Sequence, residues 1–178
     1  MNVNNVNKNR GFSPPLTWVI KIENGAEKLL GLGAVAGIVA LCGVVMLQIF
    51  GRLFMDVPPV WTEELSRYLF SGTVALTIGI AYKRGELVAV DLLCNSLNQR
   101  NAHFFNAFVA LVIFVFGLVL YPSAVQFTQI GEYQMSPTMF FPMSYVFGST
   151  ILILLNLMFF ALLAFIRHLL SAFHGGDI

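Results

Sequence analysis

Long apolar runs without charge alternate with short polar segments along this chain. The runs 29–51, 104–130 and 133–166 contain no Asp, Glu, Lys or Arg. Each is long enough for a helix to cross a hydrocarbon core of about 30 Å at about 1.5 Å per residue. A shorter run, 68–82, can cross only if its helix begins several residues earlier. The pattern predicts an all-α membrane protein with four transmembrane helices, at about 29–51, 63–82, 104–127 and 142–166.

The remaining segments are predicted to flank or connect these helices, which form a domain at 29–167. Residues 1–28 are expected to be a polar tail whose second half is either an interfacial helix or an ordered lead-in. Segment 86–100 alternates Leu and Val with Glu, Asp and Asn, which predicts a short cytoplasmic-side amphipathic helix between helices 2 and 3. Prolines divide the last apolar run, so we expect an irregular interfacial approach over 133–141. Residues 168–178 are predicted to be a C-terminal tail.

The basic residues are unequally distributed between the two sides of the predicted membrane. Only Arg52 and Arg67 fall on one side, and the other eight of the ten Lys and Arg residues fall on the opposite side. Those eight are Lys8, Arg10, Lys21, Lys28, Lys83, Arg84, Arg100 and Arg167. The positive-inside rule therefore predicts that both termini and the segment 83–103 are cytoplasmic.

Composition excludes several other classes of protein. Of the 178 residues, 57% are hydrophobic and 11% are charged, with a mean hydropathy of +0.78. Soluble domains usually carry about a quarter charged residues. These values exclude an ordinary soluble domain, a disordered chain and a basic nucleic-acid-binding module. Cys42 and Cys94 form no CxxC pair and are expected to pack rather than to carry redox chemistry.

Small residues form a stripe on each of the first two predicted helices. Helix 2 carries Ser71, Ala75 and Gly79 at intervals of four residues. Helix 1 carries five small residues at intervals of three and four: Gly33, Ala36, Gly37, Ala40 and Gly43. Small residues let two helices approach closely in lipid. The stripes therefore indicate either packing within the four-helix unit, which we favour, or a surface for a partner subunit.

The polar segment before helix 2 carries the most informative charged residues. Thr62 is expected to cap the helix, and Glu63 and Glu64 suit the positive end of its dipole. Arg67 lies four residues after Glu63 and three after Glu64, so it can pair with either. One interpretation is a helix start with a local ion pair that serves structure or partner contact. The other is a charged site at membrane depth that handles ions or protons.

No catalytic motif is visible in the sequence. It contains no HExxH, GxSxG, P-loop or dinucleotide-binding fingerprint. The three histidines lie near predicted helix ends or in the tail and do not pair as haem ligands would. We therefore predict a protein that is not an enzyme and has no cofactor of its own. A competing hypothesis is an autonomous four-helix carrier that uses Glu63 or Glu64 for ion coupling.

Three short motifs occur in the first half of the predicted domain and the segment that follows. The first is the segment WTEELSRY that begins at Trp61, the second is GIAYKRGE from Gly79, and the third is VDLL around Asp91. Together they resemble the small membrane subunit, the DctQ-like family, of tripartite ATP-independent periplasmic (TRAP) transporters. The resemblance covers roughly 29–167. Members of the family often have His where Leu87 stands here, so no role is assigned to that position.

The resemblance implies a non-catalytic scaffold subunit in the bacterial inner membrane. It implies two partners besides the lipid bilayer: a large membrane subunit that holds the substrate and sodium sites, and a periplasmic binding protein that delivers the substrate. The implied substrates are organic acids of the C4-dicarboxylate or sialic acid class, and no nucleic acid is involved. By the motif match, Trp61, Glu63, Glu64 and Arg67 support the fold or a partner contact. Asp91 matches the start of the amphipathic segment.

Overall fold

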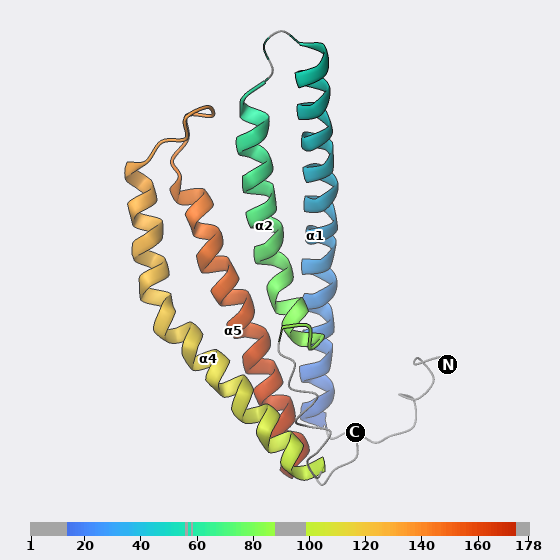
Figure 1. Cartoon of the computed structure of the whole chain (residues 1–178). Coiled ribbons are helices and arrows are strands. Elements are labelled where there is room, and N and C mark those ends of the chain that lie inside the picture. The colour runs from blue at the N-terminus through green and yellow to red at the C-terminus, as the bar shows by residue number, and fades with distance from the viewer. Residues whose placement is uncertain (1–13, 56, 58, 88–98, 174–178) are drawn as a thin grey trace, which may run out of the picture.

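The chain folds into an elongated bundle of long helices (Figure 1). This is a computed structural model, and it describes residues 14–55, 57, 59–87 and 99–173. The helices are α1 (Pro14–Phe54), α2 (Trp61–Lys83), α4 (Gln99–Ile130), the short 3-10 helix η2 (Gly131–Tyr133) and α5 (Ser144–Phe173). The all-α prediction is confirmed over the described residues.

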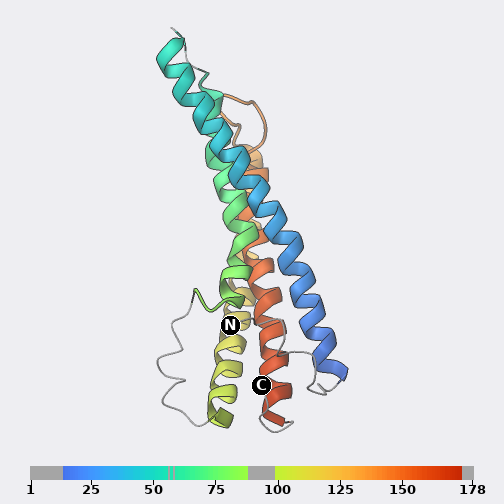
Figure 2. The ribbon, with the colours of Figure 1, turned by 90° about the vertical axis from the view of Figure 1, so that its right-hand side faces the viewer.

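Helix α5 lies between α4 and α2, and α2 lies between α5 and α1 (Figure 1). Figure 2 shows α1 crossing the other helices at an incline. We call the end with the α1–α2 connection and the 131–143 segment the upper end, and the opposite end the lower end, as oriented in Figure 1. The helices therefore form a layer in which α2 and α5 are central.

Within the described residues, three helices are long and apolar enough to cross a membrane: Trp18–Phe54, Phe104–Tyr133 and Ser144–Leu170. Helix α2 is not among them. Its 23 residues include Glu63, Glu64, Arg67 and Lys83 as well as several Ser and Thr, and these lower its mean hydropathy. That four helices span the membrane therefore remains a prediction. In the structure α2 contacts α1 on one side and α5 on the other.

The helix bounds differ from the predicted ones mainly at the lower end. Helix α1 begins at Pro14 and continues to Phe54 without a break, so residues 14–28 lead directly into the first long helix and do not form a separate helix. Helix α5 continues to Phe173 beyond the predicted limit of 166. Charged residues were expected to end these helices, but several of them find partners on neighbouring helices. Most of the predicted amphipathic helix, with Asp91, lies outside the described residues, as do residues 1–13 and 174–178 of the two predicted tails.

The core lies along α5, where small and large residues alternate. Phe160, Ala161 and Ala164 of α5 are buried, as are Ala75 of α2 and Ala110 of α4. Helix α1, in contrast, exposes large apolar side chains along most of its length, including Leu29, Leu32, Val35, Val39, Met46, Phe50 and Leu53. Apolar surface of this extent on a membrane protein faces lipid or another hydrophobic protein.

Candidate packing and partner-contact sites

The acidic residues at the start of α2 have different partners. Arg67 donates a hydrogen bond to Glu63 through Nη2 and Oε1, 2.7 Å apart, and Arg52 of α1 lies 3.7 Å from the other carboxylate oxygen. The Arg67 side chain is 73% exposed and the Glu63 side chain 47%. The sequence predicted that Arg67 pairs with either Glu63 or Glu64. In the structure it pairs with Glu63, and this ion pair lies at the surface.

Glu64 instead binds the connection between α4 and α5. One oxygen of its carboxylate accepts hydrogen bonds from the backbone amide of Thr138, at 3.2 Å, and from the Thr138 hydroxyl. In Figure 1 this connection extends from the upper ends of α4 and α5 toward the start of α2. Glu64 thus joins two segments that are 74 residues apart in the sequence.

The predicted cap at Thr62 is wrong. Helix α2 begins at Trp61, which is partly exposed, and the N-cap residue is Val60, with no side-chain capping bond. The Thr62 hydroxyl donates back to the carbonyl of Pro59 at 2.7 Å. Backbone carbonyls of Pro59 and Val60 accept from the amides of Thr62 and Glu63. These bonds replace a side-chain cap because the preceding turn already points its carbonyls at the first helical amides.

The small-residue stripe of α2 faces α5. The hydroxyl oxygens of Ser71 and Ser149 lie 2.8 Å apart. One turn below, the side-chain amide of Asn156 donates to the carbonyls of Ala75 and Leu76, at 2.8 and 2.9 Å. Asn156 is buried. Its bonds are made to another helix, and polar side chains that bond across helices stabilise helix contacts in membrane proteins.

Gly79 continues this contact at the next turn. A Cβ atom at this position would lie 2.4 Å from both Oδ1 of Asn156 and Cδ2 of Phe160. Real Cβ atoms essentially never approach other heavy atoms this closely. The absence of a side chain at Gly79 is therefore what lets α2 and α5 approach.

The stripe of helix α1 is divided between two environments. A Cβ at Gly37 would lie 2.5 Å from Oγ1 of Thr73 on α2, and one at Gly33 would lie 3.3 Å from Leu76. Ala36, Ala40 and Gly43 are exposed. Part of this stripe thus packs inside the chain and part faces outward.

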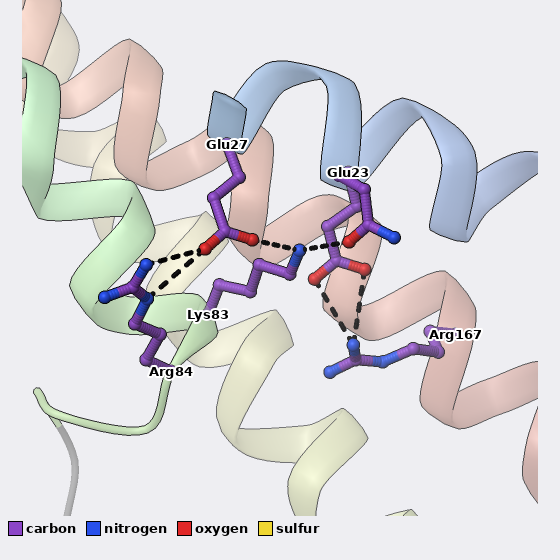
Figure 3. Close-up of polar contacts among 6 residues, drawn as sticks. Glu23, Glu27, Lys83, Arg84 and Arg167 are labelled. Carbon is purple, nitrogen blue, oxygen red and sulfur yellow. Dashed lines mark hydrogen bonds and ion pairs between the residues drawn. The ribbon is translucent and has the colours of Figure 1, made fainter. Parts of the chain in front are cut away.

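A second charged network, at the lower end, joins three helices (Figure 3). Lys83 donates to Glu27 of α1 through Nζ and Oε2, 2.7 Å apart, and to the side chain of Asn24 at the same distance. Arg84 donates to the second Glu27 oxygen from Nε and Nη2, at 3.3 and 2.9 Å. Both oxygens of Glu27 are therefore bound by the end of α2.

Glu23 completes the network from the next turn of α1. Its residue surface is only 2% exposed, and both of its carboxylate oxygens lie 3.2 Å from Nη1 of Arg167 on α5. Our sequence reasoning missed Glu23 and Glu27. The available signal was their four-residue spacing on one face of a helix, but no pattern in the sequence identifies partners that lie 56 to 144 residues away.

Comparisons with known proteins link most of the chain to one family of transporter components. The family described as tripartite ATP-independent periplasmic transporters, DctQ component, matches residues 41–172. The sialic acid TRAP transporter permease protein SiaT of Haemophilus influenzae (strain 86-028NP) is 34% identical over 96 residues, which are 54% of this chain. The matched part covers 15% of the length of that relative.

Proposed function

The chain belongs to the DctQ component family of TRAP transporters, and from this premise we propose that it is a non-catalytic scaffold subunit of a secondary transporter. In this role the chain provides a fixed hydrophobic support in the membrane. Substrate and ion binding belong to a large membrane subunit, and a periplasmic binding protein delivers the substrate. The family assignment itself supports a role in transport, and the scaffold role is our inference.

The observation that carries the scaffold role is how α2 uses its polar and small residues. Ser71 and Gly79 contact α5, and the backbone at Ala75 accepts from Asn156. These contacts are of the kind that hold helices at a fixed distance in lipid. At the two ends, Glu64 and Glu27 are bound by other segments of the same chain. A helix layer held at both ends and in the middle is suited to stay rigid beside a moving partner.

The carried substrate is proposed to be an organic acid, of the C4-dicarboxylate or sialic acid class, coupled to sodium. The similarity to a permease whose name specifies sialic acid supports this class. We assign the sodium ions to the large subunit. The proposed location is the bacterial inner membrane, with the lower end and both termini in the cytoplasm, which the distribution of Lys and Arg supports.

Reconstitution with and without the chain tests the scaffold role. Proteoliposomes would contain the large subunit encoded with this chain, with or without the chain itself, and would receive the binding protein and labelled substrate outside. We expect sodium-dependent uptake only when the chain is present. The control is the complete system with potassium in place of sodium on the outside.

Two results would contradict the proposal. Undiminished uptake without the chain would remove the need for a scaffold. Substrate flux through liposomes that contain this chain alone would favour the autonomous carrier. In that case, the substrate flux would be measured again with Glu63→Gln and with Glu64→Gln, and the substitution that abolishes it would identify the coupling carboxylate.

A further inference from the structure

The connection between α4 and α5 is an ordered loop at the upper end. After η2, Met135 and Pro142 form an antiparallel bridge, so the segment 135–142 folds back on itself as a hairpin. Near its tip, Phe140 has a φ of 55°, a left-handed conformation that non-glycine residues adopt only at an energetic cost. We call residues 134–143 the hairpin loop.

Most backbone amides of the hairpin loop donate hydrogen bonds inside the protein. The amide of Ser136 donates to the carbonyl of Phe141 at 2.9 Å, and that of Met143 donates to Gln134 at 2.9 Å. The amide of Phe140 donates to the carbonyl of Ser136, and the amide of Met139 donates to the hydroxyl of Ser136. The amide of Thr138 donates to the carboxylate of Glu64. Pro137 and Pro142 have no amide hydrogen to satisfy. Irregular backbone that is bonded in this way can leave water at little cost.

Most of the exposed large side chains of the loop and its flanks are apolar or aromatic, while Gln134 and the preceding Glu132 are exposed polar ones. Tyr133, Met135, Phe140 and Tyr145 are all strongly exposed, with Phe140 80% exposed. No Asp, Glu, Lys or Arg occurs between 133 and 166. Exposed aromatic side chains are enriched where helices leave the hydrocarbon core and enter the headgroup layer.

The loop also lies where such a layer would be. It connects the spans that end at Tyr133 and begin at Ser144, and it sits at their upper ends (Figure 1). Its exposed side chains continue the exposed apolar surfaces of α4 and α5, which include Ile130. The loop is therefore continuous with surfaces that the bilayer must cover.

We propose that the hairpin loop is an interfacial membrane anchor, which inserts Phe140 and Met135 into the boundary between headgroups and acyl chains. The anchor fixes the depth of the upper ends of α4 and α5. Glu64 holds the loop in this position through Thr138. The lipid contact of Phe140 offsets part of the cost of its backbone conformation.

Spin labelling of the full chain in lipid nanodiscs tests this anchor. In a background of Cys42→Ala and Cys94→Ala, a nitroxide is attached to Phe140→Cys or Met135→Cys, and its collision rates with oxygen and with a water-soluble nickel complex are measured. Phe116→Cys, in the middle of α4, is the reference for lipid. Val57→Cys is the matched reference for water, since Val57 is 81% exposed on the other upper connection.

The expected result is an oxygen-to-nickel ratio at positions 140 and 135 that is clearly above that at position 57 and below that at position 116. A ratio equal to that at position 57 would overturn the proposal, since the loop would then lie in water. Low collision rates with both reagents would also overturn it, because a protein surface, such as a second copy of the chain, would cover the loop. Measuring two labelled positions prevents one misfolded variant from deciding the outcome.

Discussion

The two ends of the bundle both carry acidic residues paired with arginines, but they use these pairs differently. At the upper end, Glu63 pairs with Arg67 of the same helix, four residues away, and both side chains are substantially exposed. At the lower end, Glu23 is buried and pairs with Arg167, 144 residues away. Exposed local pairs contribute about 0–1 kcal/mol to stability. A buried pair is expensive to break because the remaining charge is left without a partner.

This difference indicates that the buried pair at the lower end contributes more to stability than the exposed Glu63–Arg67 pair at the upper end. The lower network joins α1, α2 and α5, including the part of α1 before residue 29 (Figure 3). Arg67, in contrast, is left at the surface. A motif residue that adds little stability is available for contact with a partner.

The largest effect is expected at Arg167. Arg167→Ala should lower the free energy of unfolding by about 3–5 kcal/mol, because the carboxylate of buried Glu23 loses its cation. Unfolding in a graded series of SDS concentrations in mixed micelles measures this loss. Arg84→Ala is the control, since the Arg84 side chain is more exposed and Glu27 keeps Lys83. Equal effects of the two substitutions would contradict the proposed difference between buried and exposed pairs.

A smaller effect is expected at the α2–α5 contact. Gly79→Ala should cost about 1–3 kcal/mol, because the added methyl group overpacks against Asn156 and Phe160. Gly72→Ala on the same helix is a matched control, since no atom lies within 4 Å of its added Cβ. Thermal unfolding in mild detergent compares the two. If Gly72→Ala were as harmful, close approach at Gly79 would not be the reason for the loss.

Asn156→Leu should cost less, about 1 kcal/mol, the usual size of an interhelical hydrogen bond in a membrane protein. It removes the two bonds to the carbonyls of Ala75 and Leu76 but keeps a side chain of similar size. The same thermal unfolding assay measures it. A loss that matched Arg167→Ala would show that the middle of the bundle, rather than its lower end, carries most of the stability.

The smallest effect on stability is expected at Arg67. Arg67→Ala should change the free energy of unfolding by about 0–1 kcal/mol, because its pair with Glu63 is exposed. Thermal unfolding of the isolated chain and the yield of the complex with the large subunit should therefore respond differently. A lower yield with unchanged stability would place Arg67 at a partner contact. Recovery of the yield by the exchanged pair, Glu63→Arg with Arg67→Glu, would instead trace the loss to the local ion pair.

The sequence predicted well those features that depend on near neighbours. The all-α class and the apolar runs follow from composition and hydropathy. The Glu63–Arg67 pair follows from a spacing of four residues on a helix. The predicted cap at Thr62 failed because the turn that begins at Pro59 supplies backbone acceptors. Residues 14–28 were not recognised as part of α1, because the charges among them were expected to mark the end of a helix.

By itself, the sequence determined which segments are apolar and which side chains each helix carries, since these depend only on residue type and helical period. The tertiary structure decided which of these side chains meet. Only there does Glu64 reach Thr138, Gly79 lie against Asn156, and Glu23 find Arg167. The physical reason is that burial and pairing depend on the distance between helices far apart in the chain. A charge that looks exposed in the sequence can therefore be the one on which the fold depends most.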